Sequence, residues 1–323
     1  KGLRSTALCN NTFLPEPSHL DNISIPLSGA RLPHIRFGLA QKSLSDACAT
    51  RPFDGIIGMC QAAASLNGEL TLLNQLVCGG LVDKLMFSVW IDPDPSYSSE
   101  GLVIIGGVDS SLYTGPLLYV KTASDMFWQI KLTGIRINNG DLLARGSVAV
   151  IDSGGDGIWL PVNMVRLLND RFLKSVRLSA ANEAIHCDHV TNLPVLHFLI
   201  GRISVSLGPE YYTNRFLHIC DAFSNHIVYE YSSNPCHRVS IISSNCTRTY
   251  ALQTTTNGQE VCRVLLKEST HELAGYTVLG IPLLRKFYTF DREEFNRGII
   301  RNIWGTTIPP VYEQCNYSKM INE

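Results

Sequence analysis

The stretch VAVIDSGGDGIWLP, residues 148–161, leads four apolar residues directly into a carboxylate, a small hydroxyl and a glycine-rich turn, and then becomes apolar again. A carboxylate at the end of a buried strand loses its hydration, so it needs hydrogen bonds or a second group that shares its charge. The glycines let the backbone turn back sharply under the strand. The stretch therefore predicts a buried strand that ends at Asp152, which is either a catalytic acid or a costly turn residue.

Length and composition describe an ordinary globular protein. The 323 residues are 45% hydrophobic, which allows a large core and predicts one or two domains. The net charge is -1 without a block of like charge, so we expect neither nucleic acid nor an anionic membrane surface as a partner. No apolar run reaches the roughly 18 residues of a membrane span, and KGLRSTALCNN at the start lacks the apolar core of a signal peptide. We therefore expect a mature or trimmed chain.

The cysteines and glycosylation motifs favour the secretory pathway. Ten cysteines are many for a reducing compartment, and they form neither a CxxC pair nor a zinc-spaced cluster with histidine. Four N-x-S/T motifs agree with this interpretation. We expect a secreted or endolysosomal glycoprotein with disulfides, and a membrane anchor beyond Glu323 stays open. The motifs begin at Asn10, Asn22, Asn245 and Asn316.

Short runs rich in Val, Ile and Leu recur between turn signals and predict a fold made mainly of antiparallel β-sheet. Helical patterns cover only residues 70–85, interrupted by two glycines, and residues 162–174. The Pro-, Asp- and Ser-rich residues 91–101 predict a hairpin loop, and the polar residues 214–259 predict a long surface loop tied by a disulfide. The strand-like runs are NISIPLSG, HIRFGLA, MFSVWI, GLVIIGG, WQIKLTGIRINNG, SVAVIDSGG, VLHFLIGRISVSLG and YTFDREEF.

Six blocks, in a fixed order that covers most of the chain, resemble the pepsin-like aspartic proteases. The tail EQCNY, residues 313–317, is also similar to the end of memapsin (beta-secretase) ectodomains. The six blocks are FDGIIGM (53–59), GLVDKLMFSVWI (80–91), GLVIIGGVDSSLYTGPLLYV (101–120), FWQIKLTGIRINN (127–139), AVIDSGG (149–155) and YTVLGIPLLRKFYTFDREE (276–294).

The resemblance implies an all-β, bilobal fold with a substrate cleft between the lobes. Each lobe of that family supplies an Asp-Thr/Ser-Gly turn, supported by an apolar-apolar-Gly strand. Here Asp152, Ser153 and Gly154 match the second turn, and VLG at 278–280 matches the supporting strand. Asp152 would then be catalytic on the cleft floor, with Ser153, Gly154 and Gly155 supporting the turn.

The resemblance also divides the chain and pairs two cysteines. Residues 1–110 would be a partial N-terminal lobe, and residues 111–323 a C-terminal lobe with a cysteine-containing insertion at about 214–259. Cys187 and Cys262 occupy positions similar to the disulfide common in the second lobe. His186 and His189 flank Cys187, but without further ligands at suitable spacing we expect no metal site there.

The implied chemistry is the hydrolysis of a peptide or protein substrate by two aspartates, without metal or cofactor. In this family the two carboxylates share one proton. The ionised carboxylate takes a proton from a bound water that attacks the peptide carbonyl carbon. The protonated carboxyl group donates its proton to the carbonyl oxygen.

Only one of the two aspartates is found in this sequence. Asp21 and Asp46 precede the FDGIIGM block, but neither is followed by Thr/Ser-Gly, and no tyrosine or tryptophan that could serve a substrate-covering flap occurs before residue 90. Three interpretations stay open. The chain is the heavy chain or a trimmed form of a protease whose first aspartate lies on an upstream light chain, it is an inactive binding protein, or it dimerises so that two copies of Asp152 meet.

Two positions depart from the family pattern. Gly155 stands where the family generally has a Ser or Thr whose hydroxyl bonds to the carboxylate, and Ile281 stands where it usually has Asp. Both departures favour weak or lost activity. We expect Asp156 to be a turn residue and Trp159 to belong to the core.

Overall fold

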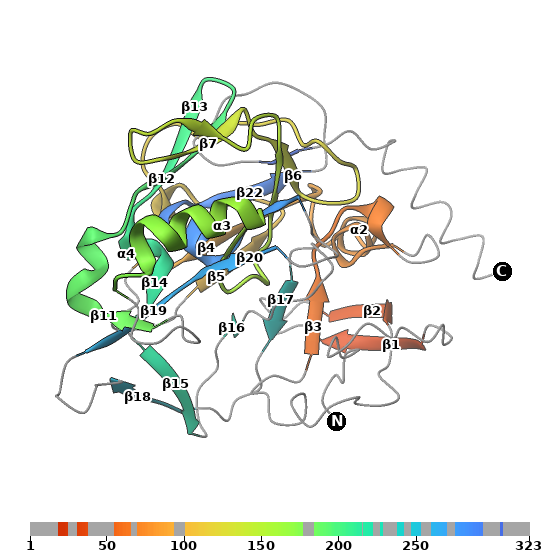
Figure 1. Cartoon of the computed structure of the whole chain (residues 1–323). Coiled ribbons are helices and arrows are strands. Elements are labelled where there is room, and N and C mark those ends of the chain that lie inside the picture. Colours follow the sequence, from red (N-terminus) through yellow and green to blue (C-terminus); the bar gives the residue numbers. More distant parts are fainter. Residues whose placement is uncertain are drawn as a thin grey trace.

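A computed structural model describes the chain over residues 19–24, 31–37, 55–65, 70–93, 101–176, 184–214, 216–221, 227–228, 238–241, 247–252, 260–269, 275–292 and 304–305. This part of the molecule consists mainly of β-sheets with few helices (Figure 1). The expected all-β fold class is therefore confirmed. The division at residue 110 stays a prediction.

The predicted strand before Asp152 lies inside a five-stranded sheet. It is β9 (Val148–Ile151), flanked by β21 (Thr277–Leu279) in parallel and by β6 (Gln129–Lys131) in antiparallel orientation. After the turn the chain re-enters the sheet as β10 (Ile158–Leu160), which lies on the other side of β21 and pairs in parallel with β20 (Leu266–Glu268). The turn after β9 thus crosses over the end of β21.

A second sheet is formed by four strands in the order β13-β12-β7-β8. The hairpin of β12 (Leu196–Ile200) and β13 (Ile203–Leu207) turns at Gly201, whose φ of 59° is a conformation that favours glycine. β12 also pairs with β7 (Gly134–Ile137), which pairs in turn with β8 (Leu142–Leu143).

A third sheet joins an early part of the chain to a late one. β4 (Met86–Ile91) and β5 (Gly101–Ile105) pair in antiparallel register, which confirms the predicted hairpin. On its other side β4 pairs in antiparallel orientation with β22 (Thr289–Arg292), which pairs with β23 (Trp304–Gly305).

Residues 214–259 contain strands, so the expectation of a long loop is wrong for their described part. β15 (Phe216–Asp221) pairs with β18 (Thr247–Leu252), and β16 (Ile227–Val228) pairs with β17 (Arg238–Ile241). The Ser-, Thr- and Asn-rich composition of residues 214–259 is typical of loops and therefore concealed these strands.

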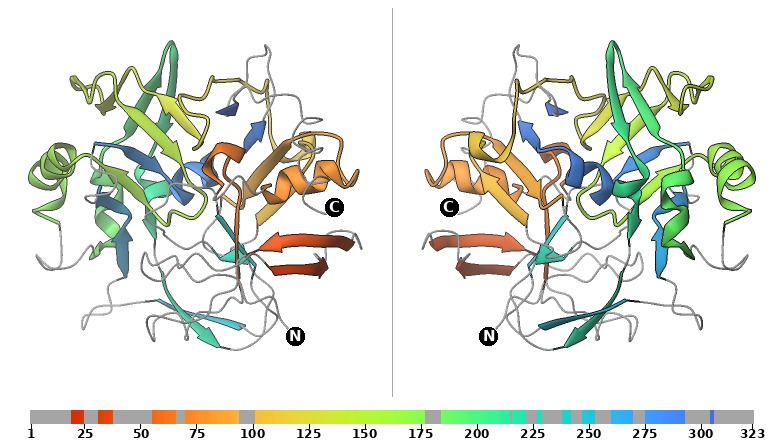
Figure 2. Two further views of the ribbon diagram at one scale, coloured as in Figure 1. Left: turned by 90° about the vertical axis from the view of Figure 1, so that its right-hand side faces the viewer. Right: turned by 90° about the vertical axis from the view of Figure 1, so that its left-hand side faces the viewer.

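The N-terminal region supplies three short strands. β17 pairs with β3 (Gly55–Gly58), which connects residues 238–241 to the front of the chain. β1 (His19–Ser24) and β2 (Arg31–Phe37) form an antiparallel hairpin, and Figure 2 shows this hairpin, in red, beside the orange helix α2 (Leu72–Cys78).

Both predicted helices are present but shorter than expected. α2 begins after Thr71, whose hydroxyl accepts a hydrogen bond from the Asn74 amide, and ends where Gly80 adopts a φ of 69°. α3 (Val162–Leu168) continues into one π-helical stretch, Asn169–Leu173, and lies over the sheet next to β20 (Figure 1).

Two further α-helices were not predicted, α4 (Pro209–Tyr212) and α5 (Ile281–Lys286). Each carries Pro in its first turn, where the missing amide hydrogen costs nothing. The first four residues of α5 are all buried, so its sequence lacks the polar face that reveals a helix. Single turns of 3-10 helix occur at Ala62–Ala64 and Ser110–Leu112, and a longer one at Cys187–Asn192.

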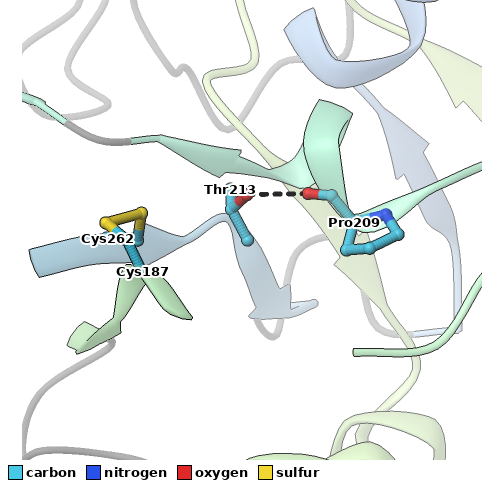
Figure 3. Close-up of a disulfide and its surroundings, with 4 residues drawn as sticks. All are labelled: Cys187, Pro209, Thr213 and Cys262. Atoms are coloured by element: carbon cyan, nitrogen blue, oxygen red, sulfur yellow. Dashed lines mark hydrogen bonds between the residues drawn. A yellow bond between two sulfur atoms is a disulfide. The ribbon is translucent and has the colours of Figure 1, made fainter. Parts of the chain in front are cut away.

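A disulfide joins Cys187 to Cys262, the pair implied by the family resemblance (Figure 3). It ties the residue after β11 (Ala184–His186) to β19 (Val261–Val264), which also pairs with β14 (Thr213–Asn214). Cys60 and Cys78 are disulfide-bonded as well. Cys9, Cys48, Cys236, Cys246 and Cys315 lie outside the described residues.

One large hydrophobic core connects these sheets. It contains the edge-to-face pair of Phe87 and Trp128, whose ring centroids are 5.8 Å apart, and the indole nitrogen of Trp128 donates to the Met59 carbonyl oxygen at 2.7 Å. Within the described segments, no helix is long and apolar enough to cross a membrane.

Candidate active site

Asp152 directly follows β9, which carries it into the interior of the molecule. Ala149 and Ile151 face the main core, while Val150 packs with Trp159 and other apolar residues on the opposite side of the sheet. Asp152 itself is only 2% exposed. The strand therefore delivers a carboxylate to a place with little water, where it needs hydrogen-bond partners.

The turn supplies such partners from its own backbone. The Gly154 amide donates to Oδ1 of Asp152 at 2.9 Å, and the Gly155 amide donates to the Asp152 carbonyl oxygen at 3.1 Å. The Asp152 amide donates to the Leu279 carbonyl oxygen at 3.1 Å, which attaches the turn to β21. An amide directed at a carboxylate oxygen orients the group and stabilises negative charge on it. The adjacent Ser153 is completely buried.

Glycines allow this turn to lie directly on the strand that supports it. A Cβ atom on Gly280 would lie 2.2 Å from the Gly155 carbonyl oxygen and 2.6 Å from that of Gly157. Both carbonyls accept hydrogen bonds from this strand end, the first from the Ile281 amide at 2.7 Å and the second from the Gly280 amide at 3.1 Å. No side chain fits at Gly280 without moving backbone, which explains the glycine that ends the VLG segment.

Gly155 has a different neighbour, the indole ring of Trp159. A Cβ atom on Gly155 would lie 2.9 Å from Cζ3 of Trp159, closer than real Cβ contacts come. Trp159 is 3% exposed and packs with Val150 and Val278, so its ring has little room to move. The glycine at this position therefore has a local cause, because the tryptophan occupies the space next to it.

Lys267 lies over the same indole ring. Its Nζ lies 5.0 Å from the centre of the Trp159 ring and 2.8 Å from each carboxylate oxygen of Asp156. Trp159 and Lys267 are directly paired across the parallel strands β10 and β20. The sequence predicts Asp156 only as a turn residue and does not predict its ion pair with Lys267. The two residues come together because β10 pairs with β20, and this strand pairing cannot be recognised in the sequence.

The structure thus brings Asp152, Ser153, Gly154 and Gly155 into one buried turn, with VLG at 278–280 beside it as expected. The catalytic role of Asp152 stays a prediction. Of the two aspartates considered earlier as substitutes for the missing one, Asp21 lies in β1 and Asp46 lies outside the described residues.

The remaining predicted sites lie away from the turn. The rings of His186 and His189 have centroids 6.2 Å apart, and the sulfur of the intervening Cys187 is bound in its disulfide and is no thiolate ligand. Asn22 lies in β1. The EQCNY tail and the other three glycosylation motifs, at Asn10, Asn245 and Asn316, lie outside the described residues.

Comparisons with known proteins agree with these observations. The family model "Eukaryotic aspartyl protease" matches residues 19–220, more than half of the chain and including Asp152. Cathepsin D of Homo sapiens is 30% identical over 203 residues, 60% of this chain and 49% of cathepsin D. Napsin-A of Homo sapiens is 29% identical over 194 residues, 60% of this chain and 46% of napsin-A. Gastricsin of Macaca fuscata fuscata is 27% identical over 197 residues, 58% of this chain and 50% of gastricsin. The matched segment spans about half the length of these relatives. With the buried Asp-Ser-Gly turn and the mainly β architecture, these matches show that the chain belongs to the eukaryotic aspartyl protease family.

Proposed function

We propose that this chain is the larger part of an aspartic endopeptidase and that Asp152 is one member of its carboxylate dyad. The observation that carries the proposal is the position of Asp152, which is buried at the end of β9 with Oδ1 accepting a hydrogen bond from the Gly154 amide. Family membership supports the reaction class. The second aspartate would come from an upstream light chain, because no further Asp-Thr/Ser-Gly occurs in this sequence.

The reaction would follow from two carboxylates that hold one proton between them. The ionised group removes a proton from water as the water oxygen forms a bond to the peptide carbonyl carbon, and the protonated group gives its proton to the carbonyl oxygen. Collapse of this tetrahedral species breaks the C–N bond, with a proton delivered to the leaving nitrogen. The substrate would be an extended peptide cleaved between bulky apolar residues. The hydrogen bond from Gly154 would keep the Asp152 carboxylate in one orientation throughout.

The second candidate function is an inactive relative that binds peptide, protein or carbohydrate. It is favoured by Gly155 and Ile281, which lack the polar side chains usual at these positions. Trp159 fills the space next to Gly155, and Ile281 is buried at the start of α5. An Asp-Thr-Gly encoded upstream of Lys1 supports the protease, whereas a reading frame without one supports the binding protein.

The cysteine bonds favour a route through the secretory pathway. Cys187, Cys262, Cys60 and Cys78 are in disulfides, which form and persist in oxidising compartments. We propose a secreted or endolysosomal protein, glycosylated at one or more of its four motifs.

The test uses the protein expressed from its complete reading frame. If Asp152 belongs to the dyad, Asp152→Asn lowers kcat at least about a hundredfold, because a group that transfers protons in the transition state is lost. The matched control is Asp156→Asn, since Asp156 lies four residues further on and is 42% exposed. A statine-type transition-state mimic should bind the wild type, and its activity should follow a bell-shaped pH profile that reports the pair. Full turnover by Asp152→Asn would eliminate this mechanism.

A further inference from the structure

A row of polar side chains crosses the outer face of the sheet β13-β12-β7-β8. The register places Arg136 of β7 directly opposite His197 of β12, and His197 directly opposite Ser206 of β13. Residues directly opposite on antiparallel strands share a face, so these three side chains are neighbours. Their sequence neighbours on β7 and β12, such as Ile135 and Phe198, are buried in the core on the other face. Nδ1 of His197 and the hydroxyl oxygen of Ser206 share a hydrogen bond of 2.7 Å.

A second cation approaches this row from α5, which contacts β13. It is Lys286, whose Nζ lies 4.9 Å from the ring centre of Tyr211 and 5.8 Å from that of Phe287. Burial lowers the pKa of His197, and the positive charges of Arg136 and Lys286 lower it further. The electrostatic field of both cations therefore reaches the imidazole.

Among the described residues, neither Arg136 nor Lys286 lies within ion-pair distance of a carboxylate group. Nε of Arg136 is buried and has no hydrogen-bond partner. A buried donor without an acceptor is costly and calls for a water or an ion that completes it.

We propose that Arg136, His197 and Lys286, with the hydroxyl of Ser206, form a binding site for a single phosphate or sulfate group. The guanidinium, imidazolium and ammonium groups supply charge-assisted donors, and a tetrahedral oxyanion offers acceptors to all three. The site lies on a different sheet from the Asp152 turn and does not depend on the proposed protease activity.

The site makes binding dependent on pH through His197. The charged groups that lower the pKa of its imidazole are Arg136, directly opposite on β7, and Lys286 from α5, and its neighbour on β13 is the uncharged Ser206. A neutral imidazole offers one donor fewer and no charge, so binding should tighten as the pH falls and His197 takes up a proton.

The experiment follows the His197 ring signals by NMR while sodium sulfate or sodium phosphate is added to the whole chain. Sodium chloride at equal ionic strength is the salt control. We expect a saturable shift, a raised His197 pKa with the oxyanion bound, and an affinity about tenfold or more weaker in Arg136→Gln and in Lys286→Gln. Arg202→Gln, which removes an exposed positive charge at the turn of the same hairpin, should change the affinity less than about twofold.

The two ions also distinguish the possible ligand chemistries, since tighter binding of one shows whether the site prefers a phosphate or a sulfate group. An equal shift with chloride would overturn the site, as would equal weakening by Arg202→Gln and Arg136→Gln. Circular dichroism shows whether Arg136→Gln is folded. If it is not, Arg136→Lys takes its place, and an affinity unchanged from wild type in that variant overturns the role of the guanidinium.

Discussion

Replacement of Gly155 by alanine tests whether Trp159 determines the residue at this turn. The new Cβ would lie 2.9 Å from Cζ3 of a buried ring, and overpacking of this kind costs about 1–3 kcal/mol. The φ of Gly155 is accessible to alanine, so the substitution also stabilises by about 0.4–1 kcal/mol through the unfolded chain. We therefore expect Gly155→Ala to lower the free energy of unfolding by between zero and about 2.6 kcal/mol.

The effect of Gly155→Ala on the free energy of unfolding should change from destabilising to stabilising when the indole is removed. Trp159→Ala alone should cost about 3–5 kcal/mol, as truncation of a buried aromatic residue does. In that background Gly155→Ala meets the Asp152 carbonyl oxygen at 3.3 Å and Gly280 Cα at 3.4 Å, so we expect between zero and about 1 kcal/mol of stabilisation. Urea unfolding of the four proteins, followed by far-ultraviolet circular dichroism, gives the coupling energy.

The control for this cycle is Gly107→Ala. Gly107 has no atom within 4 Å of the added Cβ and no positive φ, so its effect should stay within about 0.5 kcal/mol. If Trp159→Ala leaves too little folded protein, Trp159→Leu takes its place. Equal destabilisation by Gly155→Ala with and without the indole would refute the steric explanation.

Three further predictions concern the surroundings of the site and the second sheet. Lys267→Gln should lower the free energy of unfolding by only about 1 kcal/mol in urea titrations, because the pair with Asp156 is partly exposed (20% and 42%) and screened. Paired Cys187→Ala and Cys262→Ala should cost up to about 4 kcal/mol, since the bond closes a loop with a sequence separation of 75, and a change below 1 kcal/mol would contradict this. His197→Gln should flatten the pH dependence of stability between pH 8 and 5. The pKa of His197 is lower in the folded state than in the unfolded chain, so the unfolded chain takes up the proton first as the pH falls. The contribution of neutral His197 to stability is therefore fully present above about pH 6.5 and is lost as the pH falls toward the folded pKa. If the free energy of unfolding of His197→Gln depended on pH as steeply as that of the wild type, the lowered pKa of His197 would be contradicted.

Local patterns predicted several of the strands outside residues 214–259. The apolar run before Asp152 became β9, and MFSVWI corresponds to the whole of β4. Such runs are short, β-branched and bounded by turn residues, which distinguishes them from helices without any knowledge of their partners.

Features that depend on contacts between distant residues could not be predicted in this way. The α5 helix is buried along its first four residues and so resembles a strand. Lys267 lies over Trp159 because β10 and β20 pair in parallel. A glycine is needed at position 155 because the indole ring of Trp159 lies next to it. Each is a consequence of packing, which periodicity does not encode.

The pairing of β4 with β22 has a consequence for how this protein would behave after proteolytic processing. Four residues of β22 face four residues of β4, and Phe87, Val89 and Ile91 of β4 belong to the common core. A single backbone cut anywhere from residue 106 to residue 288 would separate these strands covalently but leave them adjacent in one ladder. A nicked form should therefore give two bands on a reducing denaturing gel and yet elute from a sizing column as one particle.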